Sequence, residues 1–282
     1  MSDSSPLGKV PRASAFDDRV CVVTGASSGL GRRTALDLAA AGAKVCVAAR
    51  RQERLESLVA EMGGESAGHS FVVTDVSKRP DVQALVRHVE DTYGRLDVLI
   101  NNAGFAGGEG LKGPESVEEL ERVMATNFFG AVYCTAEFLP LLTGSAPSHV
   151  VNIASMSGRI ATPGVPNYVA SKFALVGWTE ALEPELARRG VHLSSVEPGF
   201  VPTEGFPQKN MVGDKVLKYL LGTEQQVSDA IQDAILNKKV QRVVPRWYYA
   251  LQVPRVLSPW VFHKLKSKVI DSGVGRRAAD FK

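Results

Sequence analysis

Cysteine is scarce in this chain of 282 residues, which contains three. Cys21, Cys46 and Cys134 each lie within an apolar stretch, where a thiol behaves as a small buried hydrophobic group. This placement argues against a disulfide framework and against a cysteine metal site, so we expect no bound metal. Sparse, unpaired cysteines are typical of a reducing compartment, and we therefore expect a cytoplasmic protein.

The sequence also lacks a long apolar run and a strong charge of either sign. No run approaches the roughly 18 apolar residues that a membrane-spanning helix needs. Residues 1–17 are polar and lack the apolar segment of a signal peptide, so we interpret them as a flexible leader. The formal net charge of +3 is too small to suggest a nucleic-acid-binding face. A hydrophobic content of 44% excludes a disordered chain.

The pattern that is present is an alternation of strand-like and helix-like segments. Short apolar runs predict strands at 19–25, 44–50, 69–76, 96–104, 148–155, 191–199 and 240–245. Helical patterns separate them, at 31–42, 51–64, 79–93, 116–142, 167–189 and 223–237. Continuous apolar strands joined by helices predict an α/β fold whose parallel sheet is covered on both faces. We expect one domain over residues 18–245, with a C-terminal extension over 246–282.

The first predicted strand ends in the glycine-rich turn TGASSGLG. Gly25, Gly29 and Gly31 would let a phosphate approach the backbone, and the following helix N-terminus offers free N–H groups to it. The spacing differs from the common G-x-G-x-x-G fingerprint, and a plain tight turn is the alternative. Its place after the first strand of a β-α-β series favours dinucleotide binding. We count Ser27, Ser28 and Leu30 of the same turn among the cofactor-binding residues.

The end of the second predicted strand bears on which dinucleotide binds. An Asp or Glu there would accept a hydrogen bond from the ribose of NAD, but this strand ends in Arg50 and Arg51. A guanidinium pairs well with a phosphate, so the sequence predicts a preference for NADP(H) over NAD(H). The alternative is that Arg50 only covers the sheet edge and that NAD(H) binds as well.

Tyr168 and Lys172 are four residues apart in a predicted helix, which places them on one face. A nearby ammonium favours the phenolate and would lower the pKa of the tyrosine, which would make it a general acid or base near neutral pH. Ser155, at the end of the fifth predicted strand, could donate to a developing oxyanion. Each residue taken singly is better explained by a structural role.

Together with the motifs around them, these residues resemble the short-chain dehydrogenase/reductase family in its single-domain form. The resemblance covers about residues 18 to 245 and rests on TGASSGLG, on Asp75-Val76, on NNAG at 101–104, on Ser155 with Tyr168-Val-Ala-Ser-Lys172, and on PGFVPT at 198–203. It implies a Rossmann-type, doubly wound parallel sheet of about seven strands with helices on both faces. It also implies hydride transfer to or from a nicotinamide.

The resemblance further implies a role for each matching residue. Ser155 would orient the substrate oxygen, Tyr168 would be the general acid or base, and Lys172 would tune Tyr168 and hold the nicotinamide ribose. Asn127 would anchor a water in a proton relay, although an ordinary helix amide is the alternative. The remaining cofactor contacts would come from Asp75, Val76, Asn102, Ala103, Gly104, Pro198, Gly199, Val201 and Thr203. A homodimer or homotetramer through the helices at 116–142 and 167–189 is implied as well.

Two segments bear on the substrate. The apolar residues of 203–222 suggest a substrate lid and a hydrophobic alcohol or ketone, though core packing explains them about as well. The extension at 246–282 mixes aromatic and basic residues and would pack on the protein or a partner, touch a membrane surface, or be disordered. We thus predict an NADP(H)-dependent alcohol dehydrogenase or carbonyl reductase. The alternatives are a catalytically silent nucleotide-binding sensor or scaffold, and a related chemistry such as epimerisation or dehydration.

Overall fold

A computed structural model describes residues 14–107, 111–204, 221–258 and 260. Most of the predicted leader and of the predicted substrate lid, residues 1–13 and 205–220, lies outside the described residues. Phe16, which falls within the predicted leader, is fully buried, and its N–H donates to Ala41 O at 3.1 Å. An apolar ring so close to the first strand gains more from the core than from solvent.

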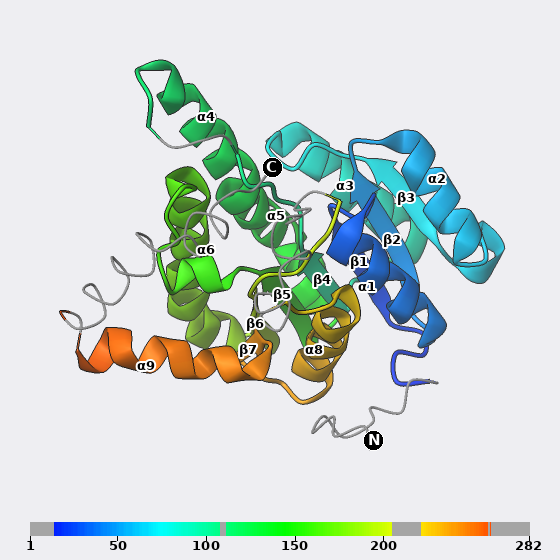
Figure 1. Ribbon diagram of the computed structural model, residues 1–282. Helices are drawn as coiled ribbons and strands as arrows, with labels where there is room; N and C mark the ends of the chain where they lie inside the picture. The colour runs from blue at the N-terminus through cyan, green and yellow to red at the C-terminus, as the bar shows by residue number, and fades with distance from the viewer. Residues whose placement is uncertain (1–13, 108–110, 205–220, 259, 261–282) are drawn as a thin grey trace, which may run out of the picture.

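The core of the fold is a seven-stranded parallel sheet in the order β3-β2-β1-β4-β5-β6-β7 (Figure 1). The strands are β1 (Val20–Thr24), β2 (Lys44–Ala49), β3 (Ser70–Val73), β4 (Val98–Asn101), β5 (Ser148–Ile153), β6 (Val191–Pro198) and β7 (Gln241–Val244). The strand order reverses between β1 and β4, which creates a crevice at the carboxyl ends of these strands. The predicted doubly wound, Rossmann-type fold is confirmed.

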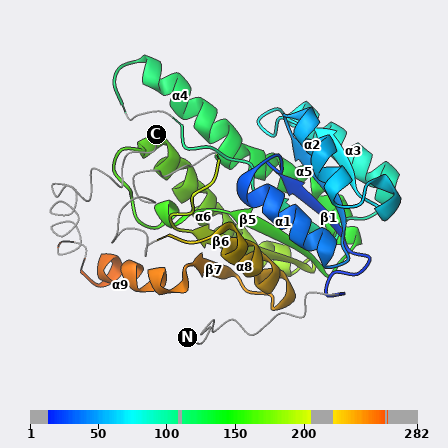
Figure 2. The same cartoon turned by 45° about the vertical axis from the view of Figure 1, so that its right-hand side comes forward.

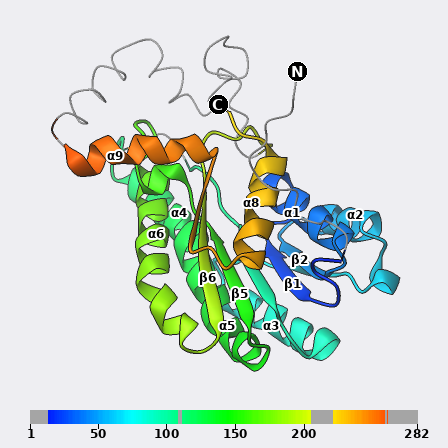
Figure 3. The ribbon, with the colours of Figure 1, turned by 90° about the horizontal axis from the view of Figure 1, so that it is seen from below.

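Helices cover both faces of the sheet, as the view in Figure 3 shows. One layer holds α1 (Gly29–Ala40), α2 (Gln52–Glu61) and α8 (Glu224–Leu236), and its core includes Leu38, Leu55 and Ile231. The opposite layer holds α3 (Arg79–Tyr93), α5 (Gly130–Gly144) and α6 (Pro166–Ala187), with Leu85, Phe138 and Leu186 in its core. Most strands contain continuous apolar runs, such as VCVV in β1, because both faces of the sheet are covered.

The predicted helix at 116–142 is not one regular helix. It consists of α4 (Glu115–Met124), a π-helical turn over Ala125–Phe129, and α5. A π-turn inserts an extra residue into a helix and is common at functional sites. Here the turn contains Asn127, whose side chain is buried and bonded to two other segments. The hydrophobic period alone cannot reveal such an insertion, because it shifts the register by a single residue.

The chain continues past β7 into a short 3-10 turn (Arg246–Tyr248) and α9 (Tyr249–Leu257). In Figure 2, α9 runs outward from the β7 edge of the sheet. Tyr248 is buried, and Gln252 Nε2 contacts Met156 Sδ at 3.7 Å. This part of the extension therefore packs on the domain, which is one of the alternatives that the sequence allows.

The three cysteine thiols are buried and free. Burial raises the pKa of Cys46 and of Cys134 to about 12, so neither is a reactive thiolate at neutral pH. Their interpretation as small core residues is confirmed. Within the described part of the chain, no helix is both long and apolar enough to cross a bilayer.

Candidate active site

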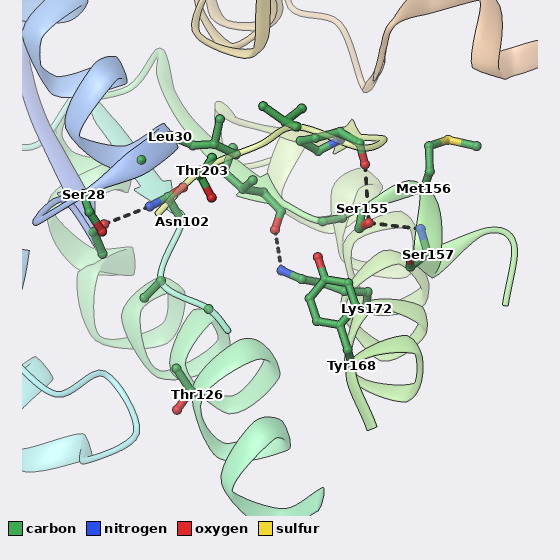
Figure 4. A pocket seen from close by; sticks show the side chains of 18 of the residues that line it. Ser28, Leu30, Asn102, Thr126, Ser155, Met156, Ser157, Tyr168, Lys172 and Thr203 are labelled. Carbon is green, nitrogen blue, oxygen red and sulfur yellow. Dashed lines mark hydrogen bonds between the residues drawn. The ribbon is translucent and has the colours of Figure 1, made fainter. Parts of the chain in front are cut away.

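A cavity of about 370 Å³ lies at the carboxyl ends of the sheet strands. It is lined by most of the residues that the sequence singled out, including the turn after β1, the segments after β2, β3 and β4, and the catalytic candidates Ser155, Tyr168 and Lys172, but not Gly31 or Asn127. Figure 4 shows Ser155, Tyr168 and Lys172 on one side of this cavity and Ser28 and Asn102 on another. The topology thus brings together segments that are up to about 220 residues apart in the sequence, from Gly25 to Tyr248.

The glycine turn has the geometry that the sequence predicted. Gly25 and Gly29 have φ of +65° and +56°, a region that favours glycine, and α1 begins at Gly29. Gly31 lies behind the cavity wall, since a Cβ there would be 2.4 Å from Asn102 Nδ2. Gly31 therefore contributes to packing, and the N–H groups at the start of α1 are the part of the turn that could hold an anion.

The end of β4 is tied to the end of β1. Asn102 Nδ2 donates to Thr24 O at 2.9 Å and to Gly25 O at 3.2 Å. The backbone N–H groups of Asn102 and Ala103 donate to Thr24 Oγ1 at 3.0 and 3.2 Å. These bonds hold the glycine turn against the segment that carries Ala103 and Gly104. Thr24 was not singled out from the sequence, although it is the first residue of the TGASSGLG motif.

Arg51 is joined directly to the glycine turn. Its guanidinium donates to Ser27 Oγ (2.9 and 3.1 Å) and to Ser28 Oγ (2.7 Å). Arg50 is exposed and lines the same cavity. Two arginines and two hydroxyls thus surround the corner where β2 ends. This corner presents hydrogen-bond donors and positive charge and could hold a phosphate, and Arg51 is also paired there with the Glu204 carboxylate.

Asp75 and Val76 follow β3 and line the cavity. Asp75 Oδ1 accepts from Ser77 N at 3.1 Å and from Ser77 Oγ at 2.7 Å, which fixes the loop. Val76 packs on the start of α5 so closely that a Cβ on Gly130 would be 2.7 Å from Val76 Cγ2. Together with the glycine turn and Arg51, these residues fit a dinucleotide: an anion-binding helix terminus, a basic corner and an apolar wall follow one another along the cavity.

Ser155, Tyr168 and Lys172 converge at the other end of the cavity. Ser155 Oγ accepts from Ser157 N at 3.0 Å and donates to Pro198 O at 3.3 Å. The Lys172 side chain is 4% exposed, and its Nζ donates to Ile153 O at 2.8 Å. The Lys172 ammonium lies 5.7 Å from the centroid of the Tyr168 ring. Both side chains come from α6 and point toward the strand end that carries Ser155 (Figure 4).

The protonation of this pair differs from the prediction that Lys172 lowers the pKa of Tyr168. Burial raises the pKa of the Tyr168 phenol to about 12, and a hydrogen bond with Ser155 acts in the opposite direction. Burial also lowers the pKa of Lys172 to about 8. Loss of hydration disfavours the charged form of each group, and this effect is larger than the attraction between them. At neutral pH the site therefore holds a protonated phenol beside an ammonium.

Asn127 does not line the cavity but lies directly behind its wall. Asn127 Oδ1 accepts from Phe105 N at 3.0 Å, and Nδ2 donates to Phe105 O at 2.9 Å and to Ser171 Oγ at 3.0 Å. A Cβ on Gly104 would be 3.2 Å from Asn127 Oδ1 and 3.6 Å from Lys172 Nζ. Asn127 thus ties the loop after β4 to the helix that carries Tyr168 and Lys172.

Sequence reasoning missed most of the wall beside Ser155. Pro198, Gly199, Val201 and Thr203 line the cavity as predicted, and they are joined there by Met156, Ile160, Thr162, Phe200, Trp247 and Tyr248. Gly199 makes room for the extension, because a Cβ on it would be 1.9 Å from Tyr248 Cε2. The absence of a side chain at Gly199 lets Tyr248 close on the loop after β6.

The lowered pKa of Lys172 predicts a pH-dependent contribution to stability. Above pH 8 the folded protein has released the Lys172 proton, whereas the unfolded chain keeps it to about pH 10.5. The unfolded state then binds more protons, so stability rises with pH over this window. We expect the difference in free energy of unfolding between the wild-type protein and K172M to rise by on the order of 3 kcal/mol from pH 7 to 10.5.

Urea unfolding without cofactor, followed at a series of pH values, measures this difference. K239M removes an exposed lysine and reports the background change. A difference between wild type and K172M that stays flat across the window would show that the ammonium is not desolvated.

Comparisons with known proteins agree with the geometry. The sequence profile of the short chain dehydrogenase family matches residues 19–211. A 3-oxoacyl-[acyl-carrier-protein] reductase of Synechocystis sp. is 33% identical over 226 residues, which cover 77% of this chain and 89% of the relative. An uncharacterized oxidoreductase of Staphylococcus aureus (strain MRSA252) is 33% identical over 222 residues, 79% of this chain and 93% of the relative.

A solved structure gives the same result. The crystal structure of a short chain dehydrogenase/reductase from Burkholderia phymatum in complex with NAD superposes with a TM-score of 0.77 at 27% identity, covering 90% of this chain and 96% of that one. The order of the strands, the glycine turn and the Ser155–Tyr168–Lys172 set all lead to the same family. The chain therefore belongs to the short-chain dehydrogenase/reductase family of oxidoreductases, which act on C=O or CH–OH groups with NAD(P).

Proposed function

We propose that this protein is an NADP(H)-dependent carbonyl reductase or alcohol dehydrogenase for a hydrophobic substrate, with Tyr168 as the general acid or base. The observation that carries the proposal is the position of Ser155, Tyr168 and Lys172 between a dinucleotide-shaped end of the cavity and an apolar end. The apolar end is formed by Met156, Ile160, Phe200 and two aromatic residues of the extension. Such a wall favours a hydrophobic alcohol or ketone.

The bound nicotinamide would supply or accept the hydride. The turn from Gly25 to Leu30 would hold the pyrophosphate, Asp75 and Val76 the adenine side, and Asn102 to Gly104 the middle of the cleft. Pro198, Gly199, Val201 and Thr203 would close over the nicotinamide. An ammonium has three N–H donors, and Ile153 O takes one from Lys172, so the others can reach the nicotinamide ribose.

Ser155 is placed to bind the substrate oxygen. Ser157 N donates to Ser155 Oγ at 3.0 Å, and Ser155 Oγ donates to Pro198 O over a longer distance of 3.3 Å. A substrate carbonyl can take over this proton at small cost, because the bond it replaces is near the limit of hydrogen-bond length. The donated proton then stabilises negative charge that develops on the oxygen during reduction.

Tyr168 would complete the proton transfer. Its phenol is protonated at neutral pH, as a proton donor in carbonyl reduction must be. As it donates, the phenolate that forms is stabilised by the Lys172 ammonium in the same water-poor site, where electrostatic attraction is strong. Asn127, which lies behind the cavity wall near this pair, would anchor a water molecule in a proton relay. In the reverse direction the same groups would accept the proton of an alcohol.

The alternative is a nucleotide-binding sensor without turnover. Such a protein would need the glycine turn and Arg51 but would gain nothing from a buried lysine, which costs free energy to keep charged. The retention of Lys172 beside Tyr168 therefore favours an enzyme.

The test is turnover with NADPH against aliphatic, aromatic, steroidal and long-chain acyl ketones, followed by the loss of reduced nicotinamide. Y168F should lower kcat at least about 10²–10⁴-fold, because the proton donor is lost, and should leave the Kd for NADPH nearly unchanged. A fully active Y168F enzyme would refute the role of Tyr168. NADPH binding without turnover of any of these ketones would favour the sensor.

The preference for NADP(H) rests on the corner formed by Arg51, Ser27 and Ser28. A hydrogen bond from a charged donor contributes about 1.5–3 kcal/mol, so R51Q should weaken NADPH binding about 10- to 100-fold and NADH binding far less. Titration of the bound dinucleotide by fluorescence gives both values of Kd. R79Q, which removes an arginine of α3 that is paired with Glu137, is the matched control. Wild-type protein that binds NADH as tightly as NADPH would contradict the preference.

We also propose a cytoplasmic homodimer or homotetramer that is joined through α4, α5 and α6. Phe129 is exposed at the π-turn and stacks on Tyr133, and Phe128 packs edge-on against Trp178 of α6. These aromatic residues form a continuous patch over two neighbouring helices. Aromatic side chains of this type are common at the centre of protein interfaces.

The extension is proposed to touch a membrane surface weakly. Tyr249, Val253, Leu257 and Trp260 follow one another at helical spacing and are exposed. Residues 261–282 contain six Lys or Arg and two Asp. An apolar helix face next to excess positive charge is typical of segments that bind anionic lipid surfaces.

Co-sedimentation with vesicles that contain phosphatidylserine tests this contact. The wild-type protein should sediment with the vesicles at low salt, and L257E should sediment several-fold less because it places a charge in the apolar face. L111E, a substitution at an exposed leucine elsewhere, is the control. Negligible binding by all three proteins would remove the membrane proposal.

A further inference from the structure

Three charged side chains meet at the basic corner of the cavity. Glu204 Oε1 accepts from Arg51 Nη1 at 2.9 Å and from Arg54 Nη1 at 2.7 Å, and Glu204 Oε2 accepts from Arg54 Nη1 at 2.7 Å. Arg51 follows β2, Arg54 lies on α2, and Glu204 follows the loop after β6. The carboxylate thus bridges two arginines from the other side of the cofactor cleft.

The bridge is placed where it can sense a ligand. Thr203, the residue before Glu204, lines the cavity beside Gly29, because a Cβ on Gly29 would be 3.2 Å from Thr203 Cβ. Arg51 holds the Glu204 carboxylate with one nitrogen and the hydroxyls of Ser27 and Ser28 with the other two. An anion that binds at Ser27, Ser28 and Arg51 therefore lies next to Glu204.

We propose that Glu204 is a specificity-determining residue whose carboxylate occupies the arginine pair until a phosphate displaces it. The proposal rests on the proposed NADP(H) preference, and it adds Arg54 and Glu204 to the residues that set it. A 2′-phosphate would take the place of the carboxylate between Arg51 and Arg54. With NAD(H), which carries no such group, the Glu204 bridge would persist beside the ribose.

The charges and exposure of the bridge suit such an exchange. Arg51, Arg54 and Glu204 are 44%, 46% and 53% exposed, and ion pairs in so much solvent contribute little to stability. A phosphate carries up to two charges and three acceptor oxygens, and it pairs with two guanidinium groups better than one carboxylate does. The exchange is favourable, but the like charge of Glu204 beside the phosphate reduces the gain.

A different role is possible for the same contacts, namely a purely structural tie between the loop after β6 and α2. The two roles predict different results. A structural tie contributes to stability whichever dinucleotide is bound, whereas a competing carboxylate changes only the affinity for ligands with a 2′-phosphate.

The test compares E204Q and R54Q with the wild-type protein. The Kd values for NADPH, NADH, adenosine 2′,5′-bisphosphate and 5′-AMP are measured by calorimetry. E204Q should bind NADPH and the bisphosphate about 3- to 10-fold more tightly, with no change for NADH and 5′-AMP, because the competing charge is lost. R54Q should weaken the same two ligands selectively. In the R54Q background, E204Q should increase the affinity for NADPH and the bisphosphate by a smaller factor.

E56Q is the matched control. Glu56 lies on α2, as Arg54 does, and its carboxylate accepts a hydrogen bond from Gln52. E56Q should change none of the four affinities by more than about 2-fold, because solvent and salt screen its charge. Two results would overturn the proposal: E204Q values equal to wild type for all four ligands, or equal shifts for ligands with and without the 2′-phosphate.

Failure of the proposed preference gives a different pattern. Wild-type protein that binds NADH as tightly as NADPH contradicts the NADP(H) preference. If E204Q then bound only NADPH and the bisphosphate more tightly, competition by the Glu204 carboxylate would still be supported. If E204Q bound them no more tightly than the wild-type protein, the competition would be refuted.

Discussion

The arrangement of the candidate active site depends on the burial of one lysine. Lys172 is almost fully removed from solvent, and its ammonium is held by the carbonyl oxygen of Ile153, the last residue of β5. Desolvation brings its pKa down to about 8 and raises that of Tyr168 to about 12, so the pair rests as an acid beside a cation. Burial of these ionisable groups costs free energy of folding, and the apolar cores on both faces of the sheet offset this cost.

The supports of this pair come from distant parts of the chain. Asn127 in the π-turn joins α6 to the loop after β4, and Ser155 is held by Ser157 N and Pro198 O. The extension after β7 adds Tyr248 against Gly199, where a Cβ would find no room. The proposed proton-transfer groups thus come from α6 and the end of β5, whereas the loops after β2, β6 and β7 line other parts of the cavity.

The sequence predicted the sheet, its parallel strands and most of the cavity lining. Strands such as Val20–Thr24 are recognisable because burial on both faces favours continuous runs of apolar residues. The prediction of one regular helix over 116–142 is wrong, because a one-residue π insertion does not show in the hydrophobic period. The predicted site residues also leave out Trp247 and Tyr248, because their approach to the cavity depends on contacts between segments far apart in the chain, which periodicity does not report.

The family and the order of the elements follow from the sequence alone, because local patterns such as TGASSGLG carry them, and the four-residue spacing of Tyr168 and Lys172 predicts the reactive groups. Only the tertiary structure decided the protonation of those groups. A pKa depends on how much water the fold removes, and the depth of burial of Lys172 is set by β5, the π-turn and α6 together. The tertiary structure likewise decided that Glu204 meets Arg51 and Arg54, about 150 residues earlier, since only the crossover of β6 brings its loop to the end of β2.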